Sequence, residues 1–168
     1  MSGPAVRVAW SRGAGRNPLE LLAVLIDTPP GALRLRRGPY GKPALEPDGP
    51  WFNWSHSEHA AVVAVSSEVE VGVDVERLRS VPRVLALAER LLPADAPALA
   101  ALVPERRAEP FLAAWCRHEA RLKCLGVGLT GPETSDPVTV LDLPAPTGFR
   151  AALAVRGQRA PHVLTEVR

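Results

Sequence analysis

The sequence is poor in cysteine, in aromatic residues and in long apolar runs. Its two cysteines, Cys116 and Cys124, stand eight residues apart in one expected helix and point in different directions, so we expect packing thiols rather than a disulfide. No Cys-x-x-Cys pair or nearby Cys/His cluster is present, which argues against a metal site built on cysteine. Aromatic residues make up 5% of the chain and the formal net charge is +2, so neither base stacking nor bulk electrostatics predicts a nucleic-acid partner.

No run of about 18 or more apolar residues occurs, so the sequence predicts no transmembrane helix and no membrane partner. The segment Met1–Arg7 lacks the apolar centre of a secretory signal, and we therefore expect a cytoplasmic protein. What the chain does contain is 46% hydrophobic and 23% charged residues over 168 positions. This composition predicts a globular protein with one sizeable core or two small linked ones.

Hydrophobic patterns divide the chain into strands and helices. Asn17, followed by Pro18 and Glu20, has the form of a helix N-cap, and the best helix begins near Pro110 and ends before Gly126. The expected strands span residues 5–10, 32–36, 51–54, 60–65, 69–76, 138–143, 149–156 and 162–167, and the expected helices span 17–27, 84–92 and 109–125, with an alanine-rich segment after residue 93. We predict that the fourth and fifth strands form a hairpin and that the last three are antiparallel. The chain then consists of two strand-plus-helix halves, residues 1–76 and 77–168.

The segment Val71–Arg77 carries two carboxylates within a strongly apolar pattern. Because strand side chains alternate between faces, Asp74 and Glu76 project together, opposite the valines. On the expected long helix, the spacing of four residues places Glu119 next to Lys123. Two carboxylates from a strand and a third from a helix suit Mg²⁺, which takes oxygen ligands and leaves positions for substrate phosphates. The alternatives are an ordinary solvent-facing strand side and an ordinary surface Glu-Lys pair.

Two polar motifs stand in the first half. Gly38–Pro43 is a turn-rich loop whose Lys42 lies close in sequence to three arginines, and this basic cluster could receive phosphates, although a single loop lysine is usually only solvated. The segment Phe52-Asn-Trp-Ser-His-Ser contains His56, for which a satisfied core histidine is the alternative to a functional role. For His59 and His162 we expect only that structural role or plain exposure. The three arginines are Arg34, Arg36 and Arg37.

Four segments occur together and in a fixed order. They are Gly41-Lys-Pro, Phe52-Asn-Trp-Ser-His-Ser, Gly72-Val-Asp-Val-Glu, and Trp115-Cys-Arg-His-Glu-Ala-Arg-Leu-Lys followed by Gly126. From about residue 33 to 128 this combination resembles the Sfp-type 4′-phosphopantetheinyl transferases. The resemblance implies transfer of the phosphopantetheine arm of coenzyme A to a serine of an acyl or peptidyl carrier protein, with release of adenosine 3′,5′-bisphosphate. It also implies an α+β fold of two similar subdomains related by a pseudo-twofold axis, with the active site in the cleft between them.

The same resemblance implies a role for each matching residue. Mg²⁺, with Mn²⁺ as the alternative, would be bound by carboxylates and would bridge the pyrophosphate of coenzyme A. Lys123 would bind the pyrophosphate and neutralise the departing group. Proton removal from the carrier serine would fall to Glu119 or to a metal-bound water. The metal ligands would be Asp74, Glu76 and Glu119; Ser55 and His56 would contact the nucleotide phosphates; and Gly41, Lys42 and Pro43 would line the pocket for the adenine and 3′-phosphate.

The chain departs from the family pattern at two places. His118 stands where the family usually has a lysine, so one fixed positive charge near the phosphates is missing if the histidine is neutral. The N-terminal half is short and lacks the usual arginine on an early helix, and Arg16 or Arg37 are the candidates to replace it. The expected partner is an acidic carrier protein, which Arg83 and Arg90 would meet, and their alternative is ordinary solvated charge. Two fused halves make a monomer sufficient.

Two other functions fit some of these motifs. One is a non-catalytic relative that binds coenzyme A or a carrier protein, which the short N-terminal half and His118 make conceivable. The other is a metal-dependent phosphohydrolase of nucleotides. A complete set of three carboxylates argues against a mere binder, and product formation without any carrier would distinguish a phosphohydrolase.

Overall fold

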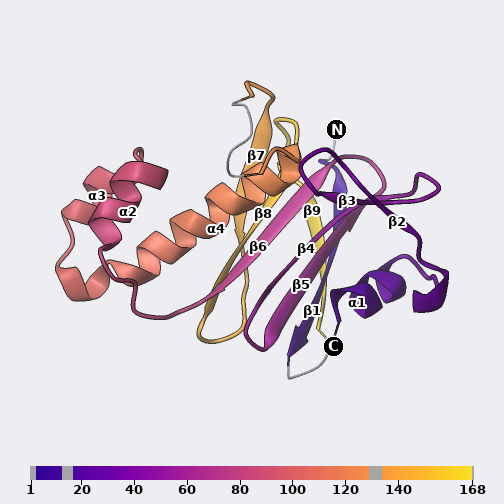
Figure 1. Cartoon of the computed structure of the whole chain (residues 1–168), viewed down its shortest axis with the longest axis horizontal. Helices are drawn as coiled ribbons and strands as arrows, with labels where there is room; N and C mark the ends of the chain where they lie inside the picture. Colours follow the sequence, from indigo (N-terminus) through magenta and orange to yellow (C-terminus); the bar gives the residue numbers. More distant parts are fainter. Residues whose placement is uncertain (1–2, 13–16, 129–133, 168) are drawn as a thin grey trace.

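The computed structural model describes residues 3–12, 17–128 and 134–167, which form an α+β fold. A helix covers the outer face of each of two sheets, and the sheets pack face to face between them (Figure 1). The elements, in chain order, are β1 Ala5–Arg12, α1 Pro18–Leu25, η1 Pro30–Ala32, β2 Leu35–Arg37, β3 Pro43–Leu45, β4 Trp51–Ser57, β5 Ala60–Ser66, β6 Val71–Arg77, α2 Val84–Leu91, α3 Ala96–Ala100, η2 Pro104–Arg106, α4 Ala108–Leu125, β7 Val138–Leu143, β8 Phe149–Arg156 and β9 His162–Val167. None of the helices among these residues is both long and apolar enough to cross a bilayer.

Strand pairing differs from the prediction at two places. The four-stranded sheet has the order β4-β5-β1-β9 and the three-stranded sheet the order β6-β8-β7. The predicted hairpin of β5 and β6 is wrong: β5 is buried along its whole length and already pairs with β4 and β1, so β6 pairs with β8 instead. The predicted antiparallel set holds for β7 and β8 but is wrong for β9, which pairs in parallel with β1.

The halves predicted from the sequence exchange strands. β6 comes before residue 77 but lies in the sheet of β7 and β8, whereas β9 comes from the end of the chain and extends the sheet of β1. The division into residues 1–76 and 77–168 stays a prediction, as does the pseudo-twofold axis. This exchange matters for the site, because it places β6, the strand that carries Asp74 and Glu76, in the sheet on which α4 packs.

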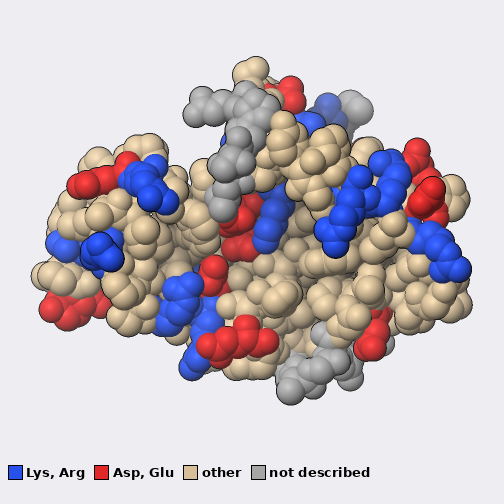
Figure 2. Space-filling model, viewed as in Figure 1, with Lys and Arg blue, Asp and Glu red and all other residues tan. Residues whose placement is uncertain are grey.

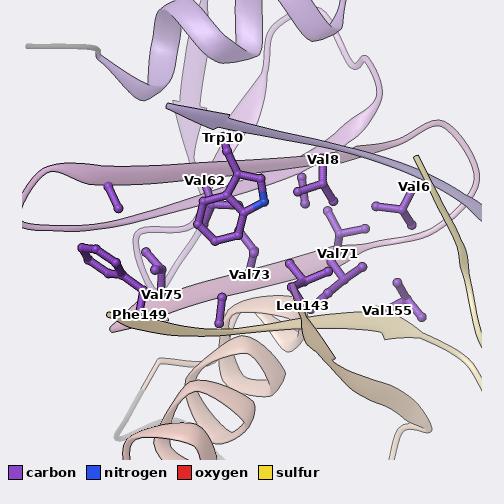
Figure 3. Packing of buried hydrophobic residues seen from close by; sticks show 14 residues of the cluster. Val6, Val8, Trp10, Val62, Val71, Val73, Val75, Leu143, Phe149 and Val155 are labelled. Atoms are coloured by element: carbon purple, nitrogen blue, oxygen red, sulfur yellow. The ribbon is translucent and has the colours of Figure 1, made fainter. Parts of the chain in front are cut away.

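The core between the sheets is built from alternate residues of facing strands. Val71, Val73 and Val75 of β6 point inward toward Val8 and Trp10 of β1, as Figure 3 shows. All five side chains are at most 2% exposed. The valine face of β6 is therefore committed to the core, which leaves its opposite face, with the two carboxylates, to α4.

Helix α4 lies directly on that opposite face. A Cβ at Gly72 would come within 2.1 Å of the carbonyl oxygen of Ala120 and 2.2 Å of the amide nitrogen of Cys124, so only glycine permits this approach. The helix ends at Gly126, whose φ of 70° is the left-handed cap that the sequence predicts. Figure 1 shows α2 and α3 at one end of the molecule, where they pack on the first turns of α4.

The N-terminal helix is shorter than predicted but begins as expected. Asn17 caps α1 by accepting a hydrogen bond from the amide of Leu19 at 3.0 Å. The helix ends at Leu25, two residues before the predicted end, and its buried leucines pack on the outer face of the four-stranded sheet. The alanine-rich segment forms only the short α3. The sequence therefore predicts the helix cap correctly and the helix lengths less accurately.

Candidate active site

The edge strands of the two sheets, β4 and β6, lie against each other along a line that we call the seam. The side chain of Asn53 accepts a hydrogen bond from the amide of Val73 at 3.0 Å, and the hydroxyl of Ser57 accepts one from the amide of Arg77 at 3.0 Å. Between them, the hydroxyl of Ser55 donates to Oδ1 of Asp74 at 2.8 Å. Alternate side chains of β4 thus replace a strand partner for β6 and fix the position of its first carboxylate.

Asp74 is the buried centre of the site, with 4% of its surface exposed. Its Oδ1 accepts from Ser55 and also from the ammonium of Lys123 at 2.6 Å. Its Oδ2 is buried and has no hydrogen-bond partner among the described residues. The alternative of an ordinary solvent-facing strand side is therefore wrong for Asp74. The alternative of a surface Glu-Lys pair is also wrong, because Lys123 pairs with a buried aspartate across the seam.

Glu76 and Glu119 complete an acidic group around Asp74. Burial raises the pKa of Glu76, and the negative charge of Asp74 raises it further. Burial is also the main cause of the raised pKa of Glu119, to which Asp74 and Glu76 add, while Lys123 opposes the shift. Arg79 pairs with Glu76 at 3.3 Å. Three carboxylates that disfavour one another's charge in a half-buried place are an arrangement that a bound cation would relieve.

A cavity of about 430 Å³ opens over this group, between β4, β6 and α4. We call it the carboxylate cavity. Its lining comes from three of the four sequence segments singled out above, and it includes the aromatic side chains of Trp54 and Trp115. Its lining residues are Trp54, Ser55, His56, Asp74, Val75, Glu76, Trp115, Glu119 and Lys123.

The donor set of the carboxylate cavity fits a hard divalent cation. Carboxylate oxygens are the ligands that Mg²⁺ and Mn²⁺ prefer, and the partnerless Oδ2 of Asp74 is a buried acceptor that such an ion would satisfy. Among the described residues, no three His, Cys, Asp or Glu side chains are yet arranged to hold a metal ion. The ion pairs with Lys123 and Arg79 occupy oxygens of Asp74 and Glu76 instead. The metal site therefore stays a prediction.

Lys42 lies at a second cavity, of about 410 Å³, which we call the lysine cavity. Its ammonium donates to the carbonyl oxygen of Cys124 in the last turn of α4 at 2.8 Å, and burial lowers its pKa. Pro43 also lines this cavity, together with the start of β4 and Gly126, whereas Gly41 does not line it. The sequence interpretation of Lys42 as merely solvated is wrong, because the side chain joins the β2–β3 turn to α4.

The arginines proposed for the nucleotide are less well placed. Arg37 donates to the carbonyl oxygen of Gly41 at 3.3 Å and lines neither the lysine cavity nor the carboxylate cavity. Arg16 lies outside the described residues. Arg36 lines the lysine cavity while it pairs with Asp48 at 2.6 Å. Of the basic cluster, Lys42 and Arg36 therefore line the lysine cavity, whereas Arg34 lines a different cavity beside α1.

The histidines take three different positions. His56 is exposed and lines the carboxylate cavity, so the alternative of a core histidine is wrong for it. His59 is exposed, which agrees with the second of its two expected positions, and its ring packs edge-on against Phe149 with centroids 5.1 Å apart. His118 lies against Trp115 with ring centroids 5.7 Å apart and does not line the cavity, and burial and the nearby Arg121 lower its pKa.

Sequence reasoning missed the two tryptophans and assigned Ser55 differently. Trp115 stands four residues before Glu119 on α4, so helical spacing could have placed it beside the carboxylates. Trp54 precedes Ser55, and it lines the cavity because the two sheets meet at the seam, a contact that no local sequence pattern indicates. Both cysteines are buried packing thiols as predicted, and burial raises the pKa of Cys124 to about 11.

Comparison with known proteins assigns the chain to a family. A model described as the 4′-phosphopantetheinyl transferase superfamily matches residues 70–163, more than half of the chain. The chain is 38% identical over 115 residues to the Synechocystis protein named "Putative 4'-phosphopantetheinyl transferase slr0495", a match that covers 66% of this chain and 47% of that protein. It is 34% identical over 122 residues to the 4′-phosphopantetheinyl transferase HetI of Nostoc, which covers 69% of this chain and 52% of HetI.

The transferase AcpT of Escherichia coli K12 is 37% identical over 91 residues, which cover 53% of this chain and 47% of AcpT. The chain thus spans about half the length of the curated relatives it matches. The family model includes β6 and α4, the elements that carry Asp74, Glu76, Glu119 and Lys123. This chain therefore belongs to the 4′-phosphopantetheinyl transferase superfamily.

Proposed function

We propose that the protein transfers the phosphopantetheine arm of coenzyme A to a serine hydroxyl of an acyl or peptidyl carrier protein and releases adenosine 3′,5′-bisphosphate. The observation that carries the proposal is the buried Asp74, which has one oxygen free of partners and shares a cavity with Glu76, Glu119 and Lys123. These residues stand on the elements that the family model matches. The named relatives give the reaction class.

In this proposal, Asp74, Glu76 and Glu119 hold Mg²⁺, with Mn²⁺ as a substitute. When bound, the cation neutralises charge on the pyrophosphate of coenzyme A. Lys123 adds an ammonium group for the phosphate oxygens of the leaving nucleotide. Ser55 holds Asp74 in place through Oδ1. His56, which lines the cavity, is exposed and free to meet a phosphate.

The transfer itself needs one proton acceptor. The oxygen of the carrier serine attacks the phosphorus that is bonded to the pantetheine oxygen, and the bond from this phosphorus to the nucleotide phosphate breaks. The serine proton passes to a carboxylate, for which Glu119 is the candidate in this chain. Glu119 lines the same cavity as Asp74 and Lys123, which brings its carboxylate to the place where the reacting phosphate would lie.

The lysine cavity is the proposed place for the adenine and 3′-phosphate. The Lys42 ammonium has three donor hydrogens and uses one in the hydrogen bond to the carbonyl of Cys124, so donors remain for a phosphate. Arg36 lines the same cavity in an ion pair with Asp48, and it would have to exchange that partner to meet a phosphate. Both cavities border β4 and α4, so one extended ligand that reaches from the lysine cavity to the carboxylate cavity suits this arrangement.

The proposed carrier partner is acidic and meets the end of the molecule formed by α2 and α3. Arg83 and Arg90 are exposed there, at the start and in the last turn of α2. Figure 2 shows basic side chains at this end of the visible face, with acidic ones beside them. A cytoplasmic location and a monomeric state remain the expectations that accompany this proposal.

The test is incubation of the protein with coenzyme A, Mg²⁺ and an apo carrier protein, read by intact mass. We expect the carrier to gain one phosphopantetheine and the gain to disappear with Glu119→Gln. Several unrelated carriers are tried, and a gain on none of them would favour the non-catalytic binder. A parallel reaction without carrier tests the phosphohydrolase: release of adenosine 3′,5′-bisphosphate at the full rate without a carrier would contradict transfer.

A further inference from the structure

We propose that Lys123 holds the place of the divalent cation in the metal-free protein, and that its ammonium leaves Asp74 when the cation binds. The inference rests on the proposed function in one respect, since that function supplies the cation. It concerns a different question, which is how a buried carboxylate remains stable before any metal or substrate arrives.

The geometry of the pair supports this role. The ammonium of Lys123 lies 2.6 Å from Oδ1 of Asp74 and 3.3 Å from the hydroxyl of Ser55, which itself donates to the same oxygen. The side chain of Asp74 is 6% exposed and that of Lys123 is 29% exposed. A carboxylate this deeply buried needs a positive partner to remain ionised, and Lys123 is the cation that contacts it.

The comparable pair on the neighbouring ligand is weaker. Arg79 lies 3.3 Å from Glu76, and its side chain is 52% exposed. Exposed pairs of this kind contribute little and exchange readily with water. Of these two ion pairs, the one between Lys123 and Asp74 therefore accounts for most of the free energy that a cation must overcome to bind.

A cation on Asp74 and the Lys123 ammonium compete for the same carboxylate. The partnerless Oδ2 and the lysine-bound Oδ1 belong to one group, so a metal on Oδ2 places two positive charges on opposite oxygens of one buried carboxylate. They repel strongly in a half-buried cavity. Lys123 is free to leave, because its stem is flexible and the open cavity lies beside it.

Two consequences follow for binding. Without coenzyme A, the cation must displace the ammonium without offering it a new partner, so its affinity is reduced. With coenzyme A present, phosphate oxygens receive the released ammonium, so each ligand strengthens the binding of the other. Thermodynamic linkage requires this coupling to be equal in both directions.

The test measures Mn²⁺ binding without carrier protein, by electron paramagnetic resonance of the free ion at pH 8. We expect Lys123→Met to bind Mn²⁺ about tenfold more tightly than the unmodified chain, since it removes one charge-assisted hydrogen bond. Arg121→Met is the matched control. It removes one positive charge from the same helix, but Arg121 donates to the carbonyl of Thr134 rather than to Asp74. We expect it to change the affinity by less than about twofold, because the Arg121 guanidinium has its own partner at Thr134 and does not compete with the ion for Asp74.

Equal gains in both variants would assign the effect to bulk charge and overturn the inference, as would unchanged or weaker Mn²⁺ binding by Lys123→Met. Coenzyme A should tighten Mn²⁺ binding several-fold less in Lys123→Met than in the unmodified chain.

If that variant does not fold, nuclear magnetic resonance of the unmodified protein provides the test. The resonance of the Lys123 ammonium, held by Asp74, should shift as Mg²⁺ saturates the site, and an unmoved resonance would contradict displacement. None of these readings requires transfer activity, so failure of the inference and failure of the proposed function are distinguishable.

Discussion

The carboxylate cavity and the lysine cavity border the same two elements but are built differently. The carboxylate cavity lies against the middle of α4 and contains three acidic side chains and one lysine. The lysine cavity lies at the end of α4, where the Lys42 ammonium in the β2–β3 turn donates a hydrogen bond to the carbonyl oxygen of Cys124. Asp74 is fixed by two partners from two elements, whereas the Lys42 ammonium has one backbone acceptor.

This difference suggests a division of labour. The family model covers the strand and helix that form most of the carboxylate cavity but begins after Lys42 and the start of β4. We therefore assign the chemical step to the carboxylate cavity and the binding of the nucleotide to the lysine cavity. Changes in the first should remove turnover or the fold that supports it, and changes in the second should weaken coenzyme A binding.

The largest effect is expected from Gly72→Ala, which leaves every charged group in place but separates β6 from α4. The new Cβ would meet the backbone of Ala120 at 2.1 Å, so helix or strand must move. We expect a loss of about 3 kcal/mol or more in the free energy of unfolding, measured with urea. The control is Gly31→Ala, where a Cβ meets nothing within 4 Å and the change should stay within about 0.5 kcal/mol. Equal midpoints for the two variants would contradict the close packing of α4 on β6.

Lys42→Met should affect the other cavity. It removes the hydrogen bond to the carbonyl of Cys124 and a donor for the nucleotide. We expect a five- to tenfold rise in KM for coenzyme A, equivalent to about 1 kcal/mol, with kcat reduced much less. Steady-state kinetics at fixed carrier concentration measures both values. A fall in kcat with unchanged KM would place Lys42 in the chemical step and remove the division between the cavities.

Reversal of charge at Arg83 and Arg90 tests a surface outside both cavities. Changing both residues to glutamate should slow modification of an acidic carrier by about tenfold at low salt through reduced electrostatic attraction. Coenzyme A binding, followed by calorimetry, should not change. Equal rates of modification before and after the change would remove these arginines from the interface.

The smallest effect is expected from His118→Lys. The pKa of His118 is lowered by burial, so the ring is neutral at pH 7 and gains its proton only as the pH falls through that lowered value. The lysine variant stays charged throughout, and its flexible stem can reach past Trp115 to the phosphates. We expect a gain of about twofold in kcat/KM at pH 8 that shrinks once the pH falls through the lowered pKa of the histidine, because the ring then also becomes charged. Catalytic efficiencies that stay unchanged across pH 6 to 8 in both forms would show that this position contributes no charge.

Local signals in the sequence predicted the elements better than their pairing. The cap of Asn17 and the end of α4 at Gly126 depend on a few neighbouring residues, and both are as predicted. The partner of β6 and the parallel pairing of β9 depend on which strand edges remain open after β5 and β1 are placed. Edge availability is a property of the whole sheet, so alternation within one strand does not determine it.

The candidate site shows the same limit at the level of side chains. Period-two alternation placed Asp74 and Glu76 on one face, and the helix pattern placed Glu119 and Lys123 one turn apart. It also indicated Glu119 as the partner of Lys123. Burial determines the partner instead. The Lys123 ammonium pairs with Asp74, the most deeply buried of the three carboxylates, rather than with Glu119 one helical turn away.

Asp74→Asn is the decisive variant for whether the carboxylate cavity carries out phosphopantetheine transfer, because it removes the charge of the side chain and keeps its shape. The measurement is the rate of mass gain by an apo carrier at saturating coenzyme A and Mg²⁺, with circular dichroism to confirm folding. Glu20→Gln, at an exposed position in the first turn of α1, is the matched control. We predict a loss of about 10³-fold for Asp74→Asn and an unchanged rate for Glu20→Gln, as expected when a group that stabilises transition-state charge is removed. A folded Asp74→Asn protein that modifies the carrier at the rate of the unmodified chain would contradict the account.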